Sequence, residues 1–141
     1  LRADARTHRA LARQLLGAAR VACESLPEIE LMVSPFSHRD DVAAVEAVLD
    51  GDRLRGARIR FAPLEGLTAD FLGRSLSCHR ALAAVGGYES TYLATSPAVI
   101  PNSELTTLDT DLGPVVEITA TDPASALVIY ARAEALLDSR P

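Results

Sequence analysis

The stretch Ala57-Arg58-Ile59-Arg60-Phe61 alternates apolar side chains with arginines. Successive side chains of a β-strand point to opposite faces of the sheet, so this alternation predicts a strand that is buried on one face and wet on the other. We expect Ala57, Ile59 and Phe61 to lie in the core and the two arginines to face water. A half-buried sheet is therefore the framework of the predicted fold.

Further strands are predicted on both sides of this one. Residues 28–33 alternate apolar and polar side chains in the same way, and Pro35 ends the pattern. Residues 105–121 contain two strands that are joined by a turn near residues 111–114. The sequence thus predicts four strands.

Residues 42–50 are compatible with two interpretations. Val42, Val45 and Leu49 lie on one face of a helix, and Gly51 suits the end of that helix. With a period of two, the same segment is instead a strand that turns back through the Asp-Gly pair at its end. The helix is the preferred interpretation, and the strand remains the alternative.

Three longer helices are predicted at residues 3–25, 68–85 and 122–137. Thr68 is the expected N-cap of the second helix, and Asp122 caps the third with proline at the first helical position. The first helix is amphipathic: its apolar face holds Leu11, Leu15, Ala18 and Ala22, and its opposite face holds Arg6, Arg9, Arg13 and Arg20.

Apolar stripes at helical spacing predict which faces of the other two helices are buried. In the second helix the stripe is Phe71, Ser75, Cys78, Leu82 and Val85, beside a neighbouring stripe of Leu72, Leu76, His79 and Ala83. In the last helix the inner face is Ala126, Ile129, Ala133 and Leu136, widened by Leu127 and Tyr130.

These elements predict an α+β fold in a single domain of residues 1–141. Its order is α-β-α-β-α-β-β-α, with helices packed mainly on one face of a mixed four-stranded sheet. Helical crossovers between the early strands favour parallel pairing, and the late hairpin favours an antiparallel edge. This layer plan resembles that of a ferredoxin-like sandwich.

Composition narrows the classes of function. The net charge of −5 argues against nucleic-acid binding, which depends on basic side chains. All 14 basic residues are arginines, a bacterial-like composition typical of GC-rich genomes. No segment has the length of a membrane span or the pattern of a signal peptide, so a soluble, cytoplasmic protein is the default expectation. Export stays open because the chain begins with Leu1 rather than methionine.

Cys78 and His79 are the most reactive pair of residue types in the chain. A thiolate and an imidazole both bind metal ions, and His38 is a candidate third ligand. Adjacent residues on a helix point about 100° apart, however, and the chain lacks the usual ligand spacings. We therefore prefer a structural, buried Cys78, and whether it pairs with Cys23 stays open.

Two further hypotheses concern the same cysteine. The segment from Ser75 to His79 resembles the haem-attachment pattern C-x-x-C-H with serine in place of the first cysteine, which leaves one thioether. Alternatively, Cys78 is a nucleophile with His79 or His38 as its base. Adjacency on a helix disfavours both.

The segment between residues 86 and 103 is long and irregular, and such segments are often functional. Tyr88 and Tyr92, with Val99 and Ile100 between two prolines, predict an interaction surface. The alternative is that the loop packs over its own sheet.

Without a catalytic constellation, the leading hypothesis is a non-catalytic domain that acts through protein contacts, as a homo-oligomer or an accessory subunit. The alternative is a metal- or haem-type cofactor-binding protein that uses Cys78 and His79; the cofactor itself is not identified.

Overall fold

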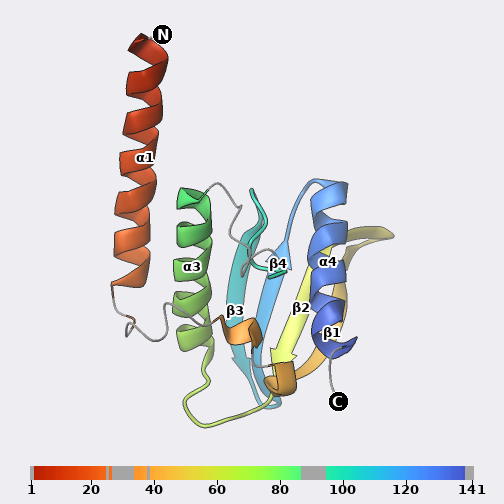
Figure 1. The fold of residues 1–141 in the computed structure, drawn as a ribbon. Helices are drawn as coiled ribbons and strands as arrows, with labels where there is room; N and C mark the ends of the chain where they lie inside the picture. Colours follow the sequence, from red (N-terminus) through yellow and green to blue (C-terminus); the bar gives the residue numbers. More distant parts are fainter. Residues whose placement is uncertain (1, 25, 27–33, 38, 87–94, 139–141) are drawn as a thin grey trace.

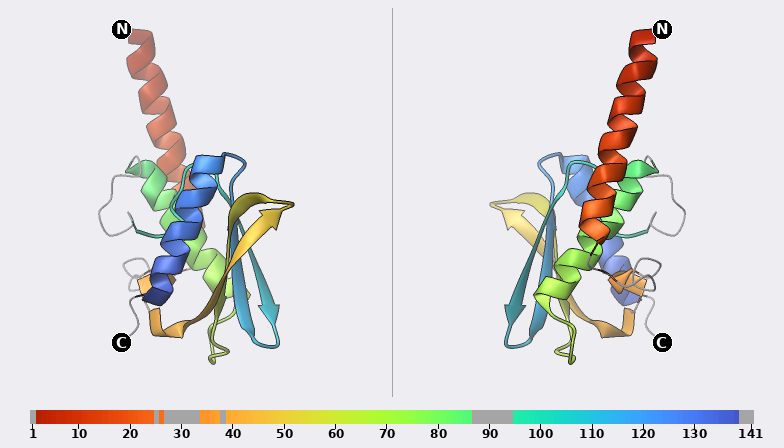
Figure 2. Two further views of the ribbon diagram at one scale, coloured as in Figure 1. Left: turned by 90° about the vertical axis from the view of Figure 1, so that its right-hand side faces the viewer. Right: turned by 90° about the vertical axis from the view of Figure 1, so that its left-hand side faces the viewer.

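The computed structural model describes residues 2–24, 26, 34–37, 39–86 and 95–138. It shows an α+β fold in which helices cover one face of a four-stranded sheet (Figures 1 and 2). The elements are α1 (Arg2–Cys23), two short 3-10 turns (Pro35–Ser37 and Arg39–Asp41), β1 (Val42–Asp50), β2 (Arg53–Phe61), α3 (Ala69–Val85), β3 (Glu104–Thr110), β4 (Gly113–Thr119) and α4 (Pro123–Asp138). The predicted class and layer plan are therefore confirmed.

The sheet consists of two hairpins that meet at its centre. The strand order is β1-β2-β4-β3, and every neighbouring pair is antiparallel. The prediction of a mixed sheet is therefore wrong, because no helix lies between the first two described strands. The chain instead reverses within the turn that includes Gly51, whose φ of 61° suits glycine.

The error arises at residues 42–50, where the preferred helix is wrong and the alternative strand is confirmed. This segment is β1, which pairs with β2 so that Val45 lies opposite Ile59. Its apolar spacing fits a helix and a strand equally, so only the pairing with β2 decides between them. The predicted strand at residues 28–33 lies outside the described residues.

The core lies between the sheet and the helical layer. Ala57, Ile59 and Phe61 are at most 1% exposed, as their alternation predicts. Helix α3 covers β3 and β4, whereas α4 covers β2 and β1. The buried residues of the main cluster from the helices and from the loop before β3 are Leu72, Leu76, Ala98, Ile100, Ile129, Ala133 and Leu136.

The opposite face of the sheet carries a row of polar side chains. Glu46, Arg58, Glu117 and Thr106 lie side by side across the strands. Arg58 Nη2 lies 2.8 Å from Glu117 Oε2, and Arg58 Nη1 lies 3.7 Å from Glu46 Oε2. No described helix covers this face (Figure 2). Its polarity is typical of the wet side of an antiparallel sheet.

Helix α1 lies outside the two layers and packs against α3. A disulfide joins Cys23 to Cys78 with a Cα–Cα distance of 4.7 Å, which answers the question of their pairing. On α1, Ala19 is buried and Leu15 is partly buried, but Leu11 is 51% exposed. The first half of α1 extends beyond the end of α3 (Figure 1).

Candidate functional site

Cys78 and His79 both lie inside the molecule, at 0% and 1% exposure. The predicted inner stripe of α3 is nevertheless wrong at its end, because Leu82 and Val85 are 36% and 39% exposed. The neighbouring stripe, from Leu72 to Ala83, is the buried one. Cys78 is covered from the other side, where its sulfur is bonded to that of Cys23 on α1.

The disulfide changes the chemistry available at this position. Metal binding and nucleophilic attack both require a thiolate, and the Cys78 sulfur is here part of a disulfide. Among the described residues, no group of three or more His, Cys, Asp or Glu side chains lies close enough to hold a metal ion. His38, the predicted third ligand, lies outside those residues. No observation in the described structure therefore favours the cofactor or the nucleophile hypothesis.

The described part of the predicted interaction loop is packed inward. Val99 and Ile100 are only 5% and 6% exposed; Val99 clusters with Ala83, and Ile100 belongs to the main core. Arg132 on α4 donates hydrogen bonds to the carbonyls of Ser96 and Val99 at 3.1 and 3.4 Å. Burial of this guanidinium lowers the pKa of Arg132. Tyr88 and Tyr92 lie outside the described residues.

Helix α4 exposes an apolar stripe on the side that faces away from the sheet. Leu127 is 59% exposed and Val128 is 40% exposed, so the prediction that Leu127 widens the inner face is wrong. Together with their exposed neighbours they form the α4 stripe: Ala124, Leu127, Val128, Ala131 and Ala135. With its inner face also apolar, α4 is apolar almost all round, which is typical of a helix that is covered on both sides.

Two carboxylates accompany the α4 stripe. Glu134 and Asp138 are both exposed and stand one helical turn apart. A hydrogen bond to Glu134 raises the pKa of Tyr130, the residue one turn earlier on the same helix. The outer side of α4 therefore combines apolar side chains with negative charge.

A second apolar surface lies where α1 leaves α3. It is a hollow of about 410 Å³ that the side chains of α1 share with the last turn of α3. Its lining residues are His8, Leu11, Ala12, Leu15, Leu16, Ala84 and Val85. The apolar face of α1 thus continues past the region that α3 covers.

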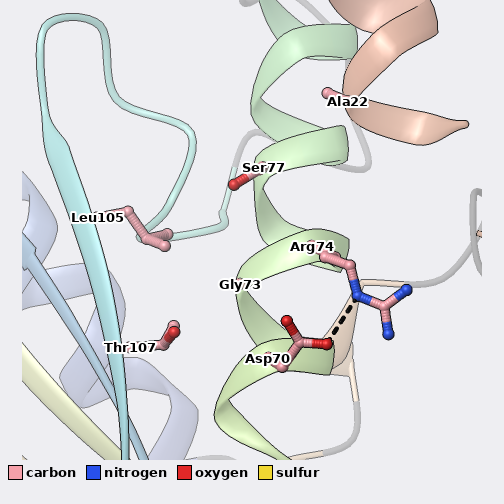
Figure 3. A pocket seen from close by; sticks show the side chains of 7 residues that line it. All are labelled: Ala22, Asp70, Gly73, Arg74, Ser77, Leu105 and Thr107. Atoms are coloured by element: carbon pink, nitrogen blue, oxygen red, sulfur yellow. Dashed lines mark hydrogen bonds and ion pairs between the residues drawn. The ribbon is translucent and has the colours of Figure 1, made fainter. Parts of the chain in front are cut away.

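A second hollow, of about 310 Å³, lies between α3 and β3 (Figure 3). Ser77 and Thr107 contribute hydroxyl groups, and Gly73 leaves the space open on α3. Arg74 Nε donates to Asp70 Oδ2 at 3.0 Å, and in Figure 3 its guanidinium points away from β3. No histidine or cysteine is among the described residues that line it, and the carboxylate that does line it, Asp70, is paired with Arg74.

Comparison with known proteins identifies no relative: no family model matches the chain, and no curated protein or solved structure is significantly similar to it. None of the described helices combines the length and the apolar character needed to cross a membrane.

Sequence reasoning missed the exposed stripe of α4. The signal was present, since the residues of the stripe recur at helical spacing on the side of α4 opposite the inner face. Periodicity alone, however, does not tell which of two apolar stripes faces the sheet.

Proposed function

We propose that this chain is a non-catalytic interaction domain, which binds protein through the exposed apolar faces of its helical layer. The observation that carries the proposal is the α4 stripe, in which Leu127 and Val128 face solvent. Contiguous apolar surface of this kind marks sites of protein contact.

The contrast between the two outer surfaces supports this proposal. The uncovered face of the sheet carries a row of paired charges beside its exposed Leu108, whereas the outer side of α4 carries a run of leucine, valine and alanine. Exposed apolar side chains gain free energy when a partner removes them from water, at roughly 25 cal/mol per Å² of buried apolar area. The helical layer is therefore the side on which a partner would be held.

Site-specific photo-crosslinking tests where the contact lies. A photoreactive phenylalanine derivative replaces Leu127 on α4 or, as a matched control, Leu108 on β3. The two leucines are similarly exposed, at 59% and 65%, but Leu108 lies on the uncovered side of the sheet with Arg58 and Glu117.

We expect irradiation of cells that naturally produce the protein to yield a crosslinked protein from position 127 and none from position 108. Mass spectrometry then identifies that protein, including a second copy of this chain. Absence of any product from position 127, or equal products from both positions, would contradict the proposal.

A further inference from the structure

We propose that the α4 stripe of one copy is covered by the free half of α1, residues 2–13, from a second copy. This inference rests on the proposed function and specifies its partner. It is carried by the complementary charge of the two helices and by the position of α1 in the fold.

The charge of the chain is divided unequally between α1 and the remainder. Helix α1 contains five arginines and one aspartate, a net charge of +4, while the rest contains nine arginines and eighteen acidic residues, a net charge of −9. A basic helix attached to an acidic body favours contact between α1 of one copy and the body of another.

The arginines of α1 are available for such a contact. Arg6, Arg9 and Arg13 are exposed on the first half of the helix. Among the ion pairs of the described residues, none involves these three side chains. Arg9 and Arg13 are four residues apart, as are Glu134 and Asp138 on α4. The two helices therefore present opposite charges at matching intervals.

The apolar surfaces also match. Ala12 and Leu16 are exposed on the flank of α1 that adjoins Arg9, whereas Leu11 lies on the face opposite the arginines. The α4 stripe is built from Leu127 and Val128 between alanines, and small side chains permit the interaxial distances of 8–10 Å that are typical of packed helices. A pair of helices in this arrangement covers apolar surface and places the charges at its rim.

The fold prevents α1 from reaching α4 of its own chain. The disulfide at Cys78 fixes α1 to α3, which covers β3 and β4, whereas α4 covers β2 and β1 on the other side of the sheet. The free half of α1 extends beyond the body (Figure 1 and Figure 2). A second molecule is therefore required.

The resulting contact is head-to-tail, because each copy uses α1 toward one neighbour and α4 toward another. Heterologous contacts of this type close into rings or continue as open chains. We therefore expect a mass that grows with concentration or settles at a closed ring.

Charge reversal tests this pairing by size-exclusion chromatography with light scattering. The donor variant is Arg9→Glu with Arg13→Glu, and the acceptor variant is Glu134→Arg with Asp138→Arg. The matched control is Arg20→Glu, which reverses an exposed arginine in the half of α1 that is anchored by the disulfide. Circular dichroism verifies that each variant is folded.

We expect the unaltered chain and the Arg20 control to associate, and each reversed variant alone to bind at least about tenfold more weakly, because like charges then face each other. An equimolar mixture of donor and acceptor variants should regain association, since opposite charges face each other again. This recovery distinguishes direct pairing from a general loss of stability.

An unaltered chain that stays monomeric at high concentration overturns the inference. So does association that neither variant weakens, and so does association that the mixture of variants does not restore. These failures are distinct from failure of the proposed function. A crosslink from Leu127 to a different protein would leave the interaction domain in place and replace only its occupant.

Discussion

Breaking the disulfide between Cys23 and Cys78 should release α1 from α3 while the sheet stays folded. The two cysteines are 55 residues apart, and a crosslink over such a loop removes chain entropy equivalent to about 4 kcal/mol. Without the crosslink, the same closure entropy opposes docking of α1.

The noncovalent contacts of α1 are too few to offset that entropy. Among the described apolar side chains of α1, Ala19 is buried, and Leu15 and Ala22 are only partly buried. Burial of one alanine and parts of two other side chains contributes roughly 2 kcal/mol. Because this is less than about 4 kcal/mol, the reduced helix should be mostly undocked.

Hydrogen exchange measured by mass spectrometry checks this prediction in the Cys23→Ala variant. Peptides from residues 2–23 should exchange about tenfold faster or more than in the oxidised chain, because an isolated helix of this length is marginal in water. Peptides from β2 and α4 serve as internal controls and should keep their protection. Unchanged protection of α1 in Cys23→Ala would refute the reasoning, since it would show that packing alone holds the helix.

Four other substitutions test the fold. Gly56→Ala should lower the free energy of unfolding by more than about 3 kcal/mol in a urea titration, because its Cβ would lie 1.9 Å from the Ile118 carbonyl oxygen. Gly17→Ala should instead raise helicity, because the added Cβ would meet no described atom within 4 Å outside its own stretch of helix. Ile129→Ala should lower the free energy of unfolding by about 2–5 kcal/mol, because the side chain is fully buried. Asp122→Ala should lower the melting temperature at neutral pH, because the carboxylate caps α4. Hydrogen bonds from Ser125 lower the pKa of Asp122 below its usual 3.8. The stabilising effect of this carboxylate is therefore fully present above pH 3.8 and is lost as the pH falls through the lowered pKa. An equal loss of melting temperature in acid and at neutral pH would contradict the last prediction.

Elements with strong local signals were predictable from the sequence. Thr68 caps α3 by accepting a hydrogen bond from the Phe71 amide at 3.1 Å, and Asp122 accepts one from the Ser125 amide at the same distance. The alternation of β2 likewise defines its buried face without reference to any other segment. In these places local geometry and tertiary packing favour the same conformation.

The missed features depend on contacts that are remote in sequence. β1 is a strand because β2 pairs with it, although its spacing also suits a helix. The buried face of α3 includes Cys78 because α1 covers that side through the disulfide, whereas Leu82 and Val85 stay exposed. The candidate interaction surface on α4 was missed for a related reason: spacing shows that Leu127 lies on an apolar stripe, but only the fold shows that this stripe faces solvent.

The assembly of the sheet from two hairpins has a consequence for folding kinetics. The pairings of β1 with β2 and of β3 with β4 join neighbouring segments, whereas the pairing of β2 with β4 brings together residues such as Ile59 and Val116. Local hairpins form within about 1–10 μs, and contacts between distant segments form more slowly. Pairing of β2 with β4 should therefore limit the folding rate. Substitutions of residues that pair between these two strands should slow refolding more than substitutions in the β1–β2 or β3–β4 turn.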